Sequence, residues 1–176
     1  MTMQRNREIK AYCPDFEPIR SILSRHGASL VDNTEQVDYY YNLASDKDSE
    51  THRRLKIRID GIGPPQVIYY VEGQEQGART SSFRVWGMNG LETKDMLDAV
   101  LGIRAVVRKQ REHWEKDNVQ FHLDEVEGVG RVLEVEIQSQ EGRDAEEQLA
   151  EYQQLLGDYL GERIIGSNED LVVLPQ

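Results

Sequence analysis

Charged and apolar residues alternate along several short stretches of the chain. In the run RLKIRI at residues 54–59, three cations alternate with three aliphatic residues. Side chains two residues apart on a β-strand lie on the same face. Lys109 and Arg111 therefore share one face farther along the chain, and Glu134 and Glu136 share another. The pattern predicts strands that have one charged face and one apolar face.

These charged faces allow two interpretations. In an ordinary half-exposed sheet, the apolar face packs in the core and the charged face meets water. If the sheet closes into a barrel, the charged faces converge on a polar, ligand-filled interior. Glu8 and Lys10 near the N-terminus repeat the alternation. An interior that carries both cations and carboxylates can hold a polyphosphate and its metal ion.

The strand and helix signals predict a mixed, mostly antiparallel α+β domain. A helix is expected after Asp15, which can cap its first turn, and another after Asp144, with Glu147 completing a capping box. A third helix is expected at residues 92–101, with Met96, Leu97, Val100 and Leu101 on one face. Residues 167–174 are expected to form a short helix or strand packed on the body. Strands are expected at about residues 4–12, 36–42, 52–60, 66–71, 81–86, 105–114, 119–126 and 132–139.

Composition narrows the possible classes of function. The formal net charge of −11 argues against a nucleic-acid partner, because phosphate backbones are bound by basic surfaces. The single cysteine, Cys13, excludes an internal disulfide, and no apolar run approaches the roughly 18 residues of a membrane span. We therefore expect a cytoplasmic protein with no membrane partner, and a homodimer is an open alternative. Without repeats or a low-complexity linker, residues 1–176 are expected to form one domain, with a barrel at about 4–139 and a helical segment at about 143–176.

Several common catalytic motifs are absent from the sequence. There is no P-loop, the glycine pairs at residues 61–63 and 128–130 lack a dinucleotide fingerprint, and the four histidines lack zinc-ligand spacing. His122 shares a strand face with Asp124, although a structural barrel-wall histidine is the expected role. The tyrosines at 39–41 and 69–70 can stack on a base or be ordinary strand aromatics.

Seven short motifs follow one another along most of the chain: NREIK at 6–10, QVDYY at 36–40, RLKIR at 54–58, IYY at 68–70, VVRKQR at 106–111, HLDEVEGVG at 122–130 and LEVE at 133–136. Their order and spacing resemble the CYTH family, also called triphosphate tunnel metalloenzymes. The resemblance is strongest to the branch of class IV adenylyl cyclases, while other members are thiamine and inorganic triphosphatases.

This resemblance implies a closed tunnel of eight antiparallel strands with helices packed outside. It also implies Mg²⁺ or Mn²⁺ as a cofactor, and Lys10, Asp124 and Glu136 as catalytic residues. The implied triphosphate ligands are Lys10, Lys56, Arg58, Arg79, Lys109 and Arg111. The implied metal ligands are Glu8, Glu134, Glu136 and Asp124, the last as a ligand or as the residue that orients one.

The sequence departs from the family pattern in two places, at Asn6 and, in the part expected to recognise the nucleoside, at residues 71–74 and Glu35, where the cyclase branch has a charged Glu-Arg-Pro run and a histidine. Asn6 stands where the family's ExExK signature has its first glutamate, so an amide replaces a carboxylate. The resemblance implies a class IV adenylyl cyclase that converts ATP to cyclic AMP and pyrophosphate. A triphosphatase acting on tripolyphosphate, thiamine triphosphate or a nucleotide is the alternative. A non-catalytic module that binds polyphosphate or nucleotide is a third hypothesis, and Asn6 is its best support.

Overall fold

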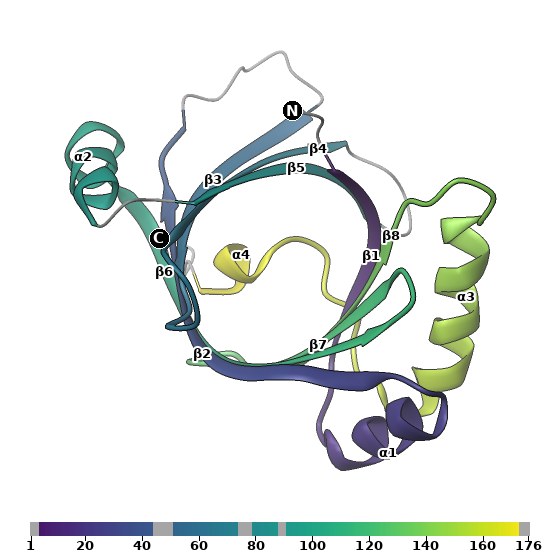
Figure 1. Ribbon diagram of the computed structural model, residues 1–176. Helices are drawn as coiled ribbons and strands as arrows, with labels where there is room; N and C mark the ends of the chain where they lie inside the picture. Colours follow the sequence, from purple (N-terminus) through teal and green to yellow (C-terminus); the bar gives the residue numbers. More distant parts are fainter. Residues whose placement is uncertain (1–3, 44–50, 74–78, 88–90, 173–176) are drawn as a thin grey trace.

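The eight strands of the protein close into a barrel. The structure is a computed structural model, and it describes residues 4–43, 51–73, 79–87 and 91–172. Neighbouring strands pair antiparallel in the order β1-β5-β4-β3-β2-β6-β7-β8, and β8 pairs back with β1 (Figure 1). The predicted fold class is thereby confirmed. The strands are β1 (Gln4–Tyr12), β2 (Ser29–Tyr41), β3 (Thr51–Ile59), β4 (Gln66–Gly73), β5 (Arg79–Gly87), β6 (Ile103–Lys116), β7 (Val119–Val126) and β8 (Gly130–Gln138).

The main hydrophobic core lies outside the ring, between the barrel wall and two helices. Helices α1 (Glu17–Arg25) and α3 (Ala145–Leu156) cover the outer face of the wall (Figure 1). Their buried residues, such as Leu23 and Leu156, pack in one cluster with Phe121 of β7 and Ile137 of β8. The apolar faces of these strands thus point outwards, which leaves their charged faces for the interior.

Helix α2 (Glu92–Leu101) packs on the outside of the barrel through only part of its apolar face. Leu97 and Leu101 pack against the cluster of Tyr41 and Ile57, and the Tyr41 hydroxyl donates to Asp98 at 2.8 Å. Met96 and Val100, which were expected on the buried face, are 55% and 72% exposed. The helix approaches the barrel mainly beside β2, and these two residues of its expected apolar face stay exposed.

Strand β2 is much longer than its sequence predicts. It begins seven residues before the expected start at Gln36, and its first half pairs with β6 from Ser29↔Glu115 onwards. This half is largely exposed and has no buried apolar face, so only its pairing with β6 reveals it as a strand. The other strands begin and end within about two residues of their expected bounds.

Both predicted aspartates bond to backbone N–H groups where a helix begins, although the N-cap residue of α1 is Phe16 and only Asp144 is itself an N-cap. The Asp15 carboxylate accepts from the backbone N–H of Glu17 at 3.0 Å, where α1 begins. The Asp144 carboxylate accepts from Glu146 and Glu147 at the start of α3, at 2.8 and 3.4 Å. None of the helices in the described part of the chain is both long and apolar enough to cross a membrane.

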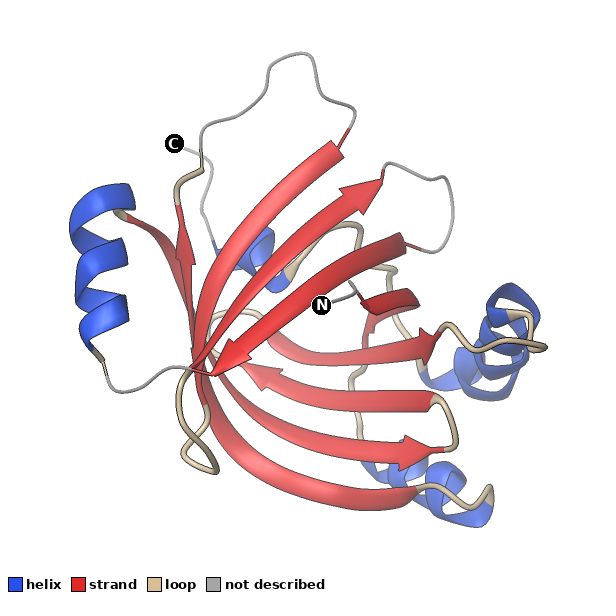
Figure 2. Ribbon diagram, turned by 45° about the horizontal axis from the view of Figure 1, so that its top comes forward, coloured by secondary structure: helices blue, strands red, loops and turns tan. Residues whose placement is uncertain are grey.

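The chain after α3 enters one end of the barrel. A 3₁₀ turn, η1 (Gly157–Tyr159), is followed by a segment beside β1, where the N–H of Ile164 donates to Lys10 O at 2.9 Å. Helix α4 (Asn168–Val172) then lies within the ring in the views of Figures 1 and 2. Ile164, Leu171 and Val172 pack there against apolar residues of the inner wall, which include Tyr40, Ala105, Val107, Val126 and Val132. We call residues 161–172 the C-terminal plug.

Candidate functional site

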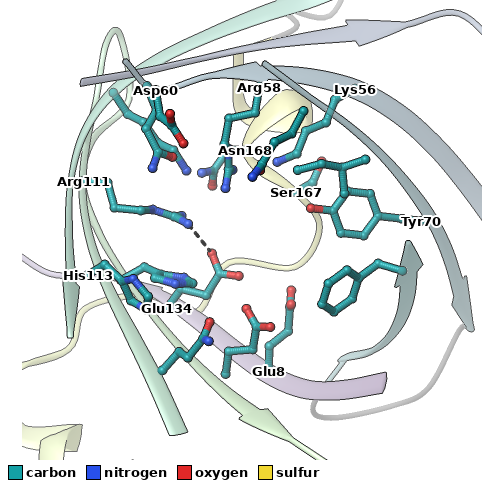
Figure 3. Close-up of a pocket in the computed structure, with 18 of the residues that line it drawn as sticks. Glu8, Lys56, Arg58, Asp60, Tyr70, Arg111, His113, Glu134, Ser167 and Asn168 are labelled. Carbon is teal, nitrogen blue, oxygen red and sulfur yellow. Dashed lines mark ion pairs between the residues drawn. The ribbon is translucent and has the colours of Figure 1, made fainter. Parts of the chain in front are cut away.

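A cavity of about 440 Å³ lies inside the barrel, on the polar side of the C-terminal plug. Figure 3 shows Lys56 and Arg58 of β3 across this cavity from Glu8 of β1, with Arg111 and Glu134 paired between them. The structure brings eight of the candidate residues together in its lining: Glu8, Lys10, Lys56, Arg58, Lys109, Arg111, Glu134 and Glu136. Arg79 belongs to β5, but its side chain lies outside the described residues.

Two cations of β3 are held in place by a buried aspartate of β2. Lys56 Nζ donates to Asp38 at 2.8 Å, and Arg58 donates to both Asp38 oxygens at 2.8 and 2.9 Å. Asp38 is absent from the candidates that the sequence identifies. Its strand alternates Gln36, Asp38 and Tyr40 toward the interior, and this alternation is the signal that could have found it.

Asp124 of β7 holds a second pair of cations in the same way. Lys109 Nζ donates to it at 3.0 Å, and Arg111 donates to both its oxygens at 2.6 Å. Asp124 is fully buried behind these cations and does not line the cavity. In this structure it therefore orients two cations, and it stands apart from the carboxylates that face the cavity.

Burial and charge set the protonation of these groups. Burial alone would raise the pKa of Asp38 and Asp124, but the paired cations outweigh it and hold both pKa values well below the usual range. Burial, followed by the charge of Arg58, lowers the pKa of Lys56 well below its ordinary value. Burial and the charge of Arg111 lower the pKa of Lys109 to about 8. A bound anion favours the charged form of a lysine. The cavity, which holds both lysines, is therefore suited to bind an anion.

Carboxylates crowd the opposite side of the cavity. Glu134 lies 3.4 Å from Lys10 Nζ and 3.9 Å from Arg111, and Glu136 accepts a hydrogen bond from the Asn6 amide. Burial, then the charges of Glu8 and Glu134, raise the pKa of Glu136 to about 7. Such repulsion between carboxylates is relieved when a cation binds among them.

A histidine stands beside these carboxylates. Each of His122, Glu134 and Glu136 offers one possible ligand atom, and these atoms lie within 4.8 Å of one another. Burial and the charge of Arg111 hold the pKa of His122 well below its ordinary range, so its imidazole is neutral. The donor set fits a divalent metal ion, because carboxylates and neutral imidazole are both metal ligands.

A third part of the lining is apolar. On β4 and β5, Ile68 stands opposite Val85, and Tyr70 opposite Phe83. The Tyr70 and Phe83 rings lie 5.9 Å apart between centroids. Of the tyrosines considered from the sequence, Tyr40 and Tyr70 line the cavity, whereas Tyr39 and Tyr41 belong to the apolar cluster that α2 contacts.

The C-terminal plug also contributes to the lining. Ser167 and Asn168 reach the cavity, and Asn168 Nδ2 lies 3.5 Å from Asp124. Glu169 is only 2% exposed, and burial raises its pKa. The sequence predicts a short element here but no part in the site, because a segment of mixed acidic and apolar residues also suits an outer surface.

Comparison with known proteins identifies the family. The model of the CYTH domain matches residues 4–162, which is most of the chain. The chain belongs to the CYTH domain family. A relative from Methanocaldococcus jannaschii, named "Putative adenylate cyclase", is 28% identical over 131 residues, which are 73% of this chain and 74% of the relative.

Solved structures share the CYTH fold seen here. A protein from Pyrococcus horikoshii OT3 has a TM-score of 0.79 at 22% identity, covering 95% of this chain and 99% of that one. A Hippeastrum protein, described as a "putative adenylyl cyclase" with a dominant triphosphatase activity, has a TM-score of 0.59 at 15% identity and covers 98% of both chains. At these identities the structures establish the fold alone.

The lowered pKa of Lys109 predicts how anion binding by this CYTH domain depends on pH. Only the protonated amine attracts a triphosphate, so affinity for tripolyphosphate without metal is expected to fall as the pH rises through about 8. Binding near pH 8 should also take up protons. Calorimetry in two buffers of different ionisation enthalpy measures both effects. Lys109→Arg should keep the affinity and flatten the pH profile near and above 8, since arginine does not deprotonate there, whereas Glu136 with its pKa of about 7 still titrates. An unchanged pH profile in this variant would assign the titration near 8 to another group.

Proposed function

We propose that this chain is a metal-dependent enzyme acting on nucleoside triphosphates, and that it converts ATP to cyclic AMP and pyrophosphate. The observation that carries this proposal is the arrangement of the barrel interior. Two pairs of cations, each oriented by a buried aspartate, face a group of carboxylates across one cavity.

The paired cations suit a triphosphate. A triphosphate carries about four negative charges, so its burial requires several cations at once. Lys56 and Arg58 come from β3, and Lys109 and Arg111 from β6, so cations reach the cavity from two parts of the wall. Since Asp38 and Asp124 already orient these side chains, little conformational entropy is lost when phosphate oxygens replace water around them.

The carboxylates suit the metal ion that the family uses. Glu134 and Glu136, with Glu8 beside them, would hold Mg²⁺ or Mn²⁺, which prefer oxygen ligands and usually share them with substrate phosphates. When bound, the ion supplies electrostatic stabilisation of the charge that develops on phosphate oxygens. Lys10, which is paired with Glu134, is placed to contact phosphate and carboxylate groups together.

The apolar part of the cavity lining favours a substrate that carries an organic group. Inorganic tripolyphosphate has no surface that would benefit from Ile68, Tyr70, Phe83 and Val85, whereas a planar base can pack on them. In the proposed reaction, the ribose 3′-hydroxyl gives up its proton to solvent, its oxygen attacks the α-phosphorus in line, the bond to the bridging oxygen breaks, and pyrophosphate leaves. Asp124 acts here as a positioning residue, through Lys109 and Arg111.

Triphosphate hydrolysis is the second candidate function. The Hippeastrum neighbour is described as having this activity. The same cations and carboxylates would serve it, with water in place of the ribose hydroxyl as the nucleophile. The two reactions differ in the nucleophile and in the phosphorus that it attacks, which is the α-phosphorus for the ribose oxygen and a terminal one for water.

Product analysis tests the proposal. ATP with Mn²⁺ at neutral to alkaline pH is expected to give cyclic AMP and pyrophosphate in equal amounts, resolved by chromatography. A parallel preparation of Glu136→Gln should form neither product, which excludes a contaminating enzyme. Rapid release of orthophosphate from tripolyphosphate, with no cyclic nucleotide from ATP, would replace the cyclase with the triphosphatase. Binding of ATP without any product would favour a non-catalytic module.

A further inference from the structure

Two buried polar atoms beside the carboxylates have no hydrogen-bond partner in the described part of the chain. They are Asn6 Oδ1 and His122 Nδ1, and their side chains are 3% and 6% exposed. A buried acceptor without a partner costs free energy comparable to a lost hydrogen bond. Both side chains line the cavity, so their missing partner is to be sought in a bound ligand.

A phosphate oxygen cannot be the partner of the Asn6 oxygen, because both accept hydrogen bonds. The imidazole nitrogen that carries no proton is likewise an acceptor. A metal ion, or water bound to one, can satisfy both side chains at once. The Asn6 amide donates its N–H to Glu136, which turns its oxygen away from that carboxylate.

His122 lies within reach of the same ion as the carboxylates. The possible ligand atoms of His122, Glu134 and Glu136 are within 4.8 Å of one another. Ligand atoms bound to one ion at about 2.1 Å stand at most about 4.2 Å apart. These three side chains would therefore move closer together to place one nitrogen and two oxygens around a single cation.

We propose that His122 is a direct metal ligand, so that the metal site of this chain has a mixed nitrogen and oxygen donor set that favours Mn²⁺ over Mg²⁺. The proposal rests on the metal dependence proposed above, and it names the ion. Imidazole is a softer ligand than carboxylate and suits transition metals, whereas Mg²⁺ is held by oxygen ligands and water. Asn6 also favours Mn²⁺ over Mg²⁺. The amide stands in place of a carboxylate and so removes one negative charge that a hard cation such as Mg²⁺ would favour.

Electron spin-echo spectroscopy of the full chain with MnCl₂ alone tests the proposal. The wild-type protein is expected to show ¹⁴N modulation from a directly bound imidazole. In His122→Gln this modulation should vanish, and calorimetry should show Mn²⁺ affinity lower by about ten- to a hundredfold, the range seen when residues supporting a metal site are changed. Mg²⁺ affinity should change much less.

His113→Gln is the matched control. His113 also lines the cavity, with its ring 5.1 Å from that of His122, but its Nδ1 lies 3.3 Å from Asp32 and it stands outside the ligand group. This variant should keep both the nitrogen signal and the Mn²⁺ affinity. Mn²⁺ bound without a nitrogen signal in the wild type would overturn the role of His122 and leave metal dependence intact. Failure of the wild type to bind Mn²⁺ or Mg²⁺ would overturn both.

Discussion

Replacing Lys109 with glutamine is expected to weaken triphosphate binding at least about thirtyfold. Loss of a charged hydrogen bond from a desolvated site costs roughly 2–5 kcal/mol, and each 1.4 kcal/mol is about tenfold in affinity. Lys109 is a better target than Arg111, because Arg111 continues to pair with Asp124 through two hydrogen bonds when Lys109 is replaced. The barrel should therefore remain folded. Calorimetric titration with tripolyphosphate at pH 7 measures the effect.

The neighbouring cation on the same strand provides the control. Arg108 precedes Lys109 on β6, yet it is exposed on the outer face of the barrel. Arg108→Gln removes the same formal charge from the protein and should leave the affinity within about twofold, since exposed charges are screened by solvent. Equal affinities in the Lys109 and Arg108 variants would mean that the interior cations are not a triphosphate site.

Glu136→Gln is expected to lower metal-dependent turnover by about a hundredfold or more, the magnitude of losing a key electrostatic contact in an active site. The glutamine still offers an oxygen to the Asn6 amide, so the local hydrogen bond survives. The substitution also removes a charge that is repelled by Glu8 and Glu134, and the free energy of unfolding should therefore stay the same or rise. Steady-state turnover and thermal unfolding of the same preparation test both statements.

Glu125→Gln controls for a simple change in net charge. Glu125 lies on β7 and is exposed on the outer surface. This variant should turn over at the wild-type rate. If Glu136→Gln instead unfolds while still binding metal normally, its carboxylate has a structural role as a partner of the cations and no metal role.

Alternation along the strands explains how much of the site the sequence predicts. Side chains two residues apart on a strand share a face. Lys109 is therefore grouped with Arg111, and Glu134 with Glu136, without knowledge of the fold. The family resemblance adds the closure that turns these faces inwards. Alternation places Asp38 on the same face as Gln36 and Tyr40, but its role as the partner of Lys56 and Arg58 appears only in the pairing with the neighbouring strand.

Features that depend on tertiary contacts are not predicted from the sequence. The first half of β2 lacks a buried face, and it is a strand only because β6 pairs with it. The exposed Met96 and Val100 of α2 have the spacing of a buried face, and nothing local indicates how little of the barrel the helix covers. His122 joins the carboxylates through pairing across β7 and β8, where it stands opposite Glu134.

The position of the C-terminal plug bears on the end of the barrel at which a substrate would enter. Ile164, Leu171 and Val172 fill one end of the barrel with apolar contacts, so under the proposed function we expect substrate to enter at the end away from α4. Both products then leave by the route through which the substrate came. The product nearer the plug can leave only after the product nearer the opening has left. Release should therefore be ordered, and the last product to leave should inhibit competitively with the substrate.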